Sequence, residues 1–109
     1  MNHFIYQYRF TNSVSMRDIE DTLMLSVIAA EALHGRSQVN LDATFHLDKK
    51  TRVCEVIAGT EVGQDIARIF TGFLAREFGE EAFEVKRLGE SDKFRRERIG
   101  NQRETVQHD

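Results

Sequence analysis

Thr60 and Gly63 stand at the predicted start of a helix, where unpaired backbone amides can bind a phosphate or a carboxylate. The same residues fit a simple threonine N-cap, which needs no ligand. The acidic neighbours Glu61 and Asp65 would repel an anion. The N-cap is therefore the favoured interpretation, and anion binding at Thr60 and Gly63 is kept as an alternative.

A second polar group consists of Asp42, His46 and Glu55, which we expect on the open face of a sheet. Such a trio can bind a divalent metal or act as a base. No second histidine falls on that face, so a solvated polar set is favoured and we predict neither a metal nor a cofactor. Cys54 is expected to be a small core residue. Because no nucleophile, base and orienting group come together, we predict no catalytic residue and a non-enzymatic protein.

The composition indicates one globular domain and a reducing compartment. The chain has 109 residues, of which 40% are hydrophobic and 30% charged, with a formal net charge of -3. Its single cysteine excludes an internal disulfide framework. Met1–Phe10 lacks the pattern of a signal peptide, and the apolar stretch Leu23–Leu33 is about half of the ~20 residues needed to cross a bilayer. We expect a cytoplasmic protein that does not bind membranes.

Alternating apolar and polar residues predict four strands, and apolar residues at helical spacing predict two helices. Ser15 is a candidate N-cap for the first helix, and Gly35 can end it. In chain order, the strands are expected over 4–10, 39–47, 52–58 and 83–88, and the helices over 16–34 and from Thr60 to Gly79.

This β-α-β-β-α-β order predicts a ferredoxin-like α+β fold, a four-stranded antiparallel sheet with both helices on one face and the first and third strands in the centre. In the hairpin, Phe45 should face Cys54 and Ala43 should face Val56. Residues 1–88 form the single predicted domain, and residues 89–109 a charged tail that is disordered or a short helix. The pattern indicates no particular family, and such a fold does not imply a function.

The second half of the first helix is apolar on nearly every side. Met24, Leu25, Ile28 and Ala32 occupy the angular positions that acidic residues hold one turn earlier. A helix that is apolar all round is normally covered on both sides, and an exposed apolar patch marks an interaction surface. The leading hypothesis is therefore a module that self-associates or binds a protein partner through these four residues. The alternative is that the tail folds back over them.

The C-terminal tail is basic over part of its length. Between residues 93 and 103 it has five basic side chains and one acidic side chain, Glu97. Such an arm can meet nucleic acid or an acidic partner, although a solvated tail is the commoner outcome. A nucleic-acid accessory role is thus a weaker alternative, after a regulatory domain that senses a small anion. The basic residues of the arm are Lys93, Arg95, Arg96, Arg98 and Arg103.

Overall fold

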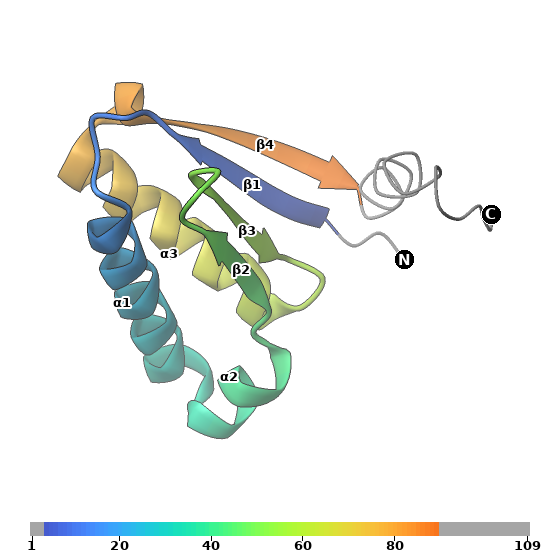
Figure 1. Cartoon of the computed structure of the whole chain (residues 1–109). Helices are drawn as coiled ribbons and strands as arrows, with labels where there is room; N and C mark the ends of the chain where they lie inside the picture. The colour runs from blue at the N-terminus through green and yellow to red at the C-terminus, as the bar shows by residue number, and fades with distance from the viewer. Residues whose placement is uncertain (1–3, 90–109) are drawn as a thin grey trace, which may run out of the picture.

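The structure is a computed structural model, and it describes residues 4–89 of the chain (Figure 1). These residues form an α+β fold with a four-stranded sheet, three α-helices and one short 3-10 helix. In chain order the elements are β1 (Phe4–Phe10), α1 (Met16–His34), α2 (Arg36–Asp42), β2 (Phe45–Asp48), β3 (Val53–Ile57), α3 (Glu61–Phe78), η1 (Glu80–Ala82) and β4 (Phe83–Gly89).

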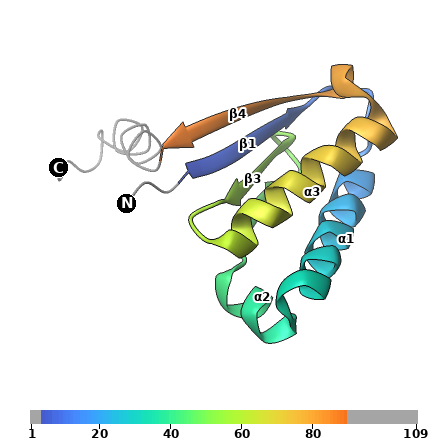
Figure 2. The same ribbon diagram turned by 180° about the vertical axis from the view of Figure 1, so that it is seen from behind.

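The sheet has the strand order β2-β3-β1-β4, and every neighbouring pair is antiparallel. The inner strands are therefore the first and third in the chain. Helices α1 and α3 lie side by side on one face of the sheet, as both ribbon views show (Figures 1 and 2). In Figure 2, α3 lies between α1 on one side and the paired strands β1 and β4 on the other.

The core fills the space between the sheet and these two helices. Tyr8 of β1 and Phe70 of α3 are both fully buried, and their rings meet edge to face with centroids 4.8 Å apart. The Tyr8 hydroxyl donates to the Ala67 carbonyl at 3.1 Å and lies 2.9 Å from the Thr71 hydroxyl. The aromatic side of β1 thus faces the helices, as the alternation in this strand predicts, and Tyr8 has partners for its polar atom.

The predicted ends of the first helix are confirmed. Ser15 accepts a hydrogen bond from the Asp18 amide at 3.4 Å, which satisfies one unpaired donor of the first turn. At the other end, Gly35 has a φ of 87°, and its amide donates to the Glu31 carbonyl. These local signals fix the length of α1 before any tertiary contact is considered.

The predicted strand over 39–47 is wrong in its first half. Residues 36–42 form helix α2, and β2 begins only at Phe45. Val39 is buried whereas Leu41 is 77% exposed. Two residues apart, these side chains share a face of a strand but point in opposite directions from a helix. The left-handed backbone of Gly35 lets α2 follow α1 directly, and a hydrogen bond of 2.7 Å from Gln38 to Asp42 links its ends.

The register of the hairpin also differs from the expected one. Phe45 pairs with Val56, and Leu47 pairs with Cys54, a shift of two residues. The turn is longer than predicted, because Arg52 adopts a φ of 61° and the Asp48 carboxylate accepts from two turn amides. A shift of two keeps each side chain on its face, so the apolar residues of both strands still point toward the core.

Helix α2 therefore changes the element order from the expected β-α-β-β-α-β. Within residues 4–89, no helix combines the length and hydropathy that crossing a bilayer requires.

Candidate interaction surface on helix α1

One side of α1 is held firmly in the core. Ile19, Leu23 and Ala30 are buried, and their spacing of four and seven residues places them on one side of the helix. Thr22 and Ser26 are also buried on this side, and their hydroxyls donate to carbonyls one turn earlier in the helix. Because these polar atoms are satisfied within α1, the helix can press them against its neighbours at little cost. The orientation of the opposite side follows from this packing.

The opposite side of α1 exposes the residues that the sequence singles out. The exposed fractions are 41% for Met24, 56% for Leu25 and 58% for Ile28, and Ala32 is exposed as well. We call these four residues the α1 patch. Ile28 is three positions from Leu25 and four positions from both Met24 and Ala32, so its side chain neighbours the other three on the helix surface. The patch is a continuous apolar strip that no described residue buries.

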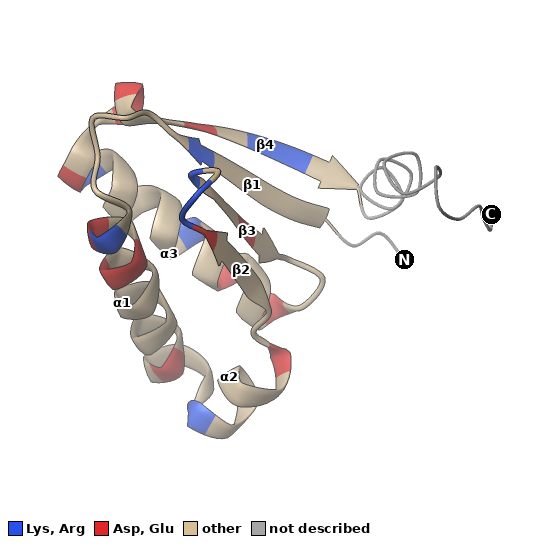
Figure 3. Ribbon diagram, viewed as in Figure 1, with Lys and Arg blue, Asp and Glu red and all other residues tan. Residues whose placement is uncertain are grey.

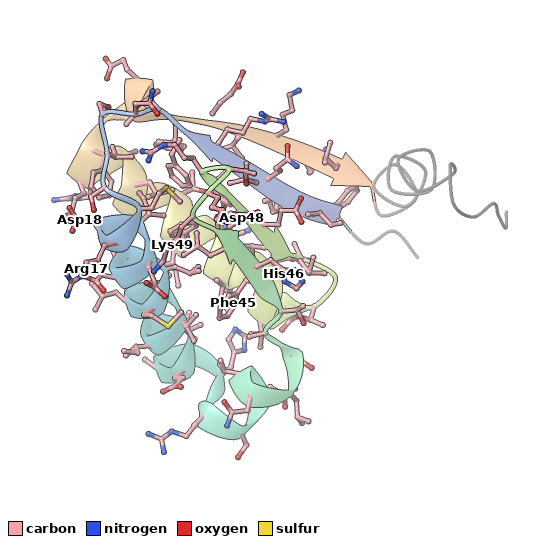
Figure 4. The ribbon with its side chains drawn as sticks, viewed as in Figure 1. Arg17, Asp18, Phe45, His46, Asp48 and Lys49 are labelled. Atoms are coloured by element: carbon pink, nitrogen blue, oxygen red, sulfur yellow. The ribbon has the colours of Figure 1, made fainter. Side chains whose placement is uncertain are left out.

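Charged residues border the α1 patch but do not enter it. Figure 3 shows charges at the first turns of α1, an uncharged middle, and charges again at the end of α1 and at the start of α2. Beside the strip, Lys49 of the β2–β3 turn reaches α1 and forms an ion pair of 2.8 Å with Glu20 (Figure 4). An apolar centre with a charged rim is the usual anatomy of a protein interface.

Thr60 and Gly63 form the favoured N-cap. The Thr60 hydroxyl accepts from the Gly63 amide at 3.0 Å, so this amide already has a partner. A Cβ at Gly63 would lie 2.2 Å from the carbonyl oxygen of Ile57, which means that glycine is needed for α3 to approach the end of β3. The geometry explains both residues by capping and close packing.

The polar trio is not assembled. His46 pairs with Glu55 across the hairpin, and it points away from the core side of β2 on which Phe45 lies (Figure 4). Asp42 belongs to α2, where its carboxylate accepts from Gln38. Glu55 instead accepts a hydrogen bond of 3.0 Å from Gln7. Within residues 4–89 there is no group of three or more histidine, cysteine or acidic side chains suited to a metal ion.

Cys54 is a buried core residue, as expected. Its side chain is fully buried, and burial raises the pKa of the thiol to about 12, with a smaller contribution from the negative charge of Glu55. The thiolate is the reactive form of cysteine. At neutral pH this thiol therefore stays protonated and is a poor nucleophile.

Two features escaped the sequence analysis. His34 does more than end α1, because its Nε2 atom lies 2.7 Å from a carboxylate oxygen of Asp65 and ties α1 to α3. Arg87 points to the helix side of the sheet, since it pairs with Tyr6, whose side chain is on that side. The sequence of the last strand contains a signal for this orientation. Phe83 and Val85 show which alternate positions point toward the helices, and Arg87 is a charged residue at the next of these positions.

The basic arm from Lys93 to Arg103 lies outside the described residues. Comparison with models of protein families, with curated proteins and with solved structures finds no match to the chain.

Proposed function

We propose that this chain is a non-enzymatic interaction module that forms a homodimer by packing the α1 patch against the same patch of a second copy. The observation that carries the proposal is the exposure of Met24, Leu25 and Ile28, each between 41% and 58%, on one side of one helix. Single exposed apolar residues are ordinary on protein surfaces, but a continuous strip of them is not.

The α1 patch is suited to self-association because its two ends differ in size. In a two-fold dimer with antiparallel α1 helices crossing at Ile28, the large Met24 of one copy meets the small Ala32 of the other. An isologous contact of this kind satisfies both copies at once. Arg36 follows the C-terminal end of α1, so the end of one copy that carries the acidic Asp21 lies toward the end of the other that precedes this basic residue. A second copy therefore complements the shape of this surface and places charges of opposite sign toward each other at its ends.

The expected affinity is moderate. Burying the exposed half of each large side chain contributes about 1 kcal/mol, or about 6 kcal/mol for the three side chains of both copies. Association also costs several kcal/mol of translational and rotational freedom, so polar contacts of the rim must add to this gain. The dimer should consequently be sought at micromolar and higher concentrations.

Two finer assignments belong to the same proposal. We regard the fold as a ferredoxin-like arrangement with α2 inserted before β2, supported by the antiparallel pairing and by the central positions of β1 and β3. We also place the protein in the cytoplasm, because its one cysteine is a free, buried thiol and a reducing compartment suits such a protein.

Light scattering and cross-linking test the dimer. The mass in solution should rise from that of one chain toward that of two as the concentration increases. In addition, Ile28→Cys should form a disulfide dimer under mild oxidation, since residues facing each other across packed helices have Cα atoms about 5 Å apart, within disulfide range. The native Cys54 does not interfere because it is buried.

Leu33→Cys is the matched control. Leu33 is 66% exposed on the same helix but lies about 140° around the helix axis from Ile28. It should cross-link much more slowly than Ile28→Cys at equal concentration. A mass of one chain at all concentrations, with equal cross-linking at both positions, would exclude the homodimer. Deletion of residues 90–109 tests whether the tail covers the α1 patch. If dimers form only after the deletion, the tail covers the patch in the full chain.

A further inference from the structure

A cavity of about 630 Å³ lies on the side of α3 that faces away from α1. Its walls come from α3 and from the paired strands β1 and β4, which lie on that side of the helix in Figure 2. Two arginines line it, Arg68 of α3 and Arg87 of β4, together with the rings of Phe4 and Tyr6 and the amide side chain of Gln64. Among the described residues 4–89, no acidic side chain lines this cavity.

Arg87 is held in place by the sheet. It pairs with Tyr6 across the β1–β4 ladder, and its guanidinium lies 4.6 Å from the centroid of the Phe4 ring. This cation–π contact holds the guanidinium near the ring and uses none of its five N–H donors. Within residues 4–89, Arg87 forms no ion pair with a carboxylate. Its positive charge therefore stands at the cavity without a described counter-ion.

Arg68 faces the same space from α3 and is loosely held. Its guanidinium lies 3.5 Å from one carboxylate oxygen of Asp65, at the limit of a hydrogen bond, and its side chain is 78% exposed. The other oxygen of Asp65 is 2.7 Å from His34, so this carboxylate is shared. Arg68 can thus turn toward a ligand while Asp65 keeps its stronger partner.

The remaining lining is small and includes one polar side chain, Thr71, whose hydroxyl donates to the Ala67 carbonyl. Ala58, Ala67 and Gly72 leave space above the rings of Phe4 and Tyr6. A Cβ placed on Gly72 would meet no atom within 4 Å, which shows that the wall is open at this point. Within the described part of the chain, the Tyr6 hydroxyl has no hydrogen-bond partner, unlike that of Tyr8. A flat apolar group fits against these rings, with polar donors at its edge.

We propose that this cavity binds an organic anion with a flat apolar body and one phosphate, sulfonate or carboxylate group. The arginines Arg68 and Arg87 bind the anionic group, and the rings of Phe4 and Tyr6 contact the apolar body. The volume lies within the range of small-molecule sites, about 300 to 1,000 Å³, and the combination of apolar walls with a few convergent polar groups is typical of them. Arginine suits such oxyanions because its fork can donate two parallel hydrogen bonds.

A fluorescent probe and its uncharged analogue test the proposal. Anilinonaphthalene sulfonate carries both required parts, whereas N-phenylnaphthylamine has the same rings without the sulfonate. In a titration of the full-length protein, the sulfonate should bind at one site per chain, and the uncharged dye at least about tenfold more weakly. Competition by naphthyl phosphate and by naphthoate then tells which anionic group the site prefers.

Arg87→Gln should raise the dissociation constant of the sulfonate dye at least about tenfold, equivalent to ~1.4 kcal/mol. Lys86→Gln is the matched control, because it removes the same charge from the neighbouring residue of β4, whose side chain is on the other face of the sheet. It should change the constant less than about twofold, since a distant exposed charge is screened by salt. Arg68→Gln gives a second variant at an exposed position and should weaken binding as Arg87→Gln does.

The proposal is overturned if both arginine variants bind the sulfonate dye as Lys86→Gln does, or if the uncharged dye binds equally well. It is also overturned if neither naphthyl phosphate nor naphthoate displaces the dye. Ile28→Ala should leave dye binding unchanged. Fluorescence lost in that variant and kept in Arg87→Gln places the dye on the α1 patch, and the cavity is then not the site.

Discussion

Replacing Ile28 by alanine should weaken the proposed homodimer by an amount that the structure sets. Removal of three carbon atoms from a fully buried side chain costs about 2.4 kcal/mol. Ile28 is 58% exposed in the single chain, so only this share of the side chain becomes newly buried on association. The expected loss is about 1.4 kcal/mol for each copy of Ile28.

Symmetry doubles this effect. The two-fold contact contains Ile28 from both copies, so the total loss is about 3 kcal/mol, equivalent to a roughly 100-fold higher dissociation constant of the dimer. The fold itself should hardly change. The covered part of the side chain contributes about 1 kcal/mol to folding, and the higher helix propensity of alanine offsets part of it.

Sedimentation equilibrium over a wide concentration range measures the dissociation constant, and chemical denaturation measures the free energy of unfolding. Leu33→Ala serves as the control, because Leu33 is 66% exposed on α1 but outside the α1 patch. It should change the dissociation constant less than about threefold, a free-energy change well below 1 kcal/mol. Equal effects of Ile28→Ala and Leu33→Ala, or no effect of either, would refute the contact through Ile28.

Four further predictions concern the fold. Gly63→Ala should lower the free energy of unfolding by about 1 to 3 kcal/mol, because the new methyl group meets the Ile57 carbonyl. Gly72→Ala should instead stabilise α3, because a methyl group at this position has open space around it. Similar denaturation midpoints for the two variants would contradict this expectation. Tyr8→Phe should cost about 1 kcal/mol through the loss of a buried hydrogen bond, and an unchanged denaturation midpoint would speak against that bond. Cys54 has a pKa raised to about 12, so alkylation at pH 8 should be about a thousandfold slower than in the unfolded chain, and rapid labelling of folded protein would contradict its burial. Because the unfolded chain loses this thiol proton first, stability should fall as the pH rises from about 9 toward 12.

Local signals predicted most of the helical and strand segments. Ser15 and Gly35 fix the ends of α1 through hydrogen bonds within the helix, so no distant contact is needed to place them. Between Val39 and Leu47 the local pattern is misleading, because apolar residues alternate as in a strand. A helix of seven residues has too few turns to show its own period. The helical period becomes visible only in the structure, where Val39 is buried and Leu41 is exposed.

The α1 patch could be predicted because its residues are adjacent on one helix and their period gives their direction. The cavity could not, since Arg68 and Arg87 belong to elements that the sequence places separately. They face one space only because α3 packs toward β3 and α1, which leaves the inward side of β4 uncovered at Arg87. A charged residue in the inward phase of a strand is the one local indication of such a site.

The positions of the α1 patch and the cavity make the two proposals independent. The patch faces outward from α1, and α3 separates α1 from the cavity walls on β1 and β4 (Figure 2). A dimer formed through α1 therefore leaves both cavities accessible. Since no cavity residue belongs to α1, ligand binding has no direct contact through which to change the strength of the dimer. Equal affinity for the dye in wild type and in Ile28→Ala would support this separation. Any coupling between ligand binding and dimer formation would have to pass through α3, where the link between His34 and Asp65 joins α1 to α3 next to Arg68.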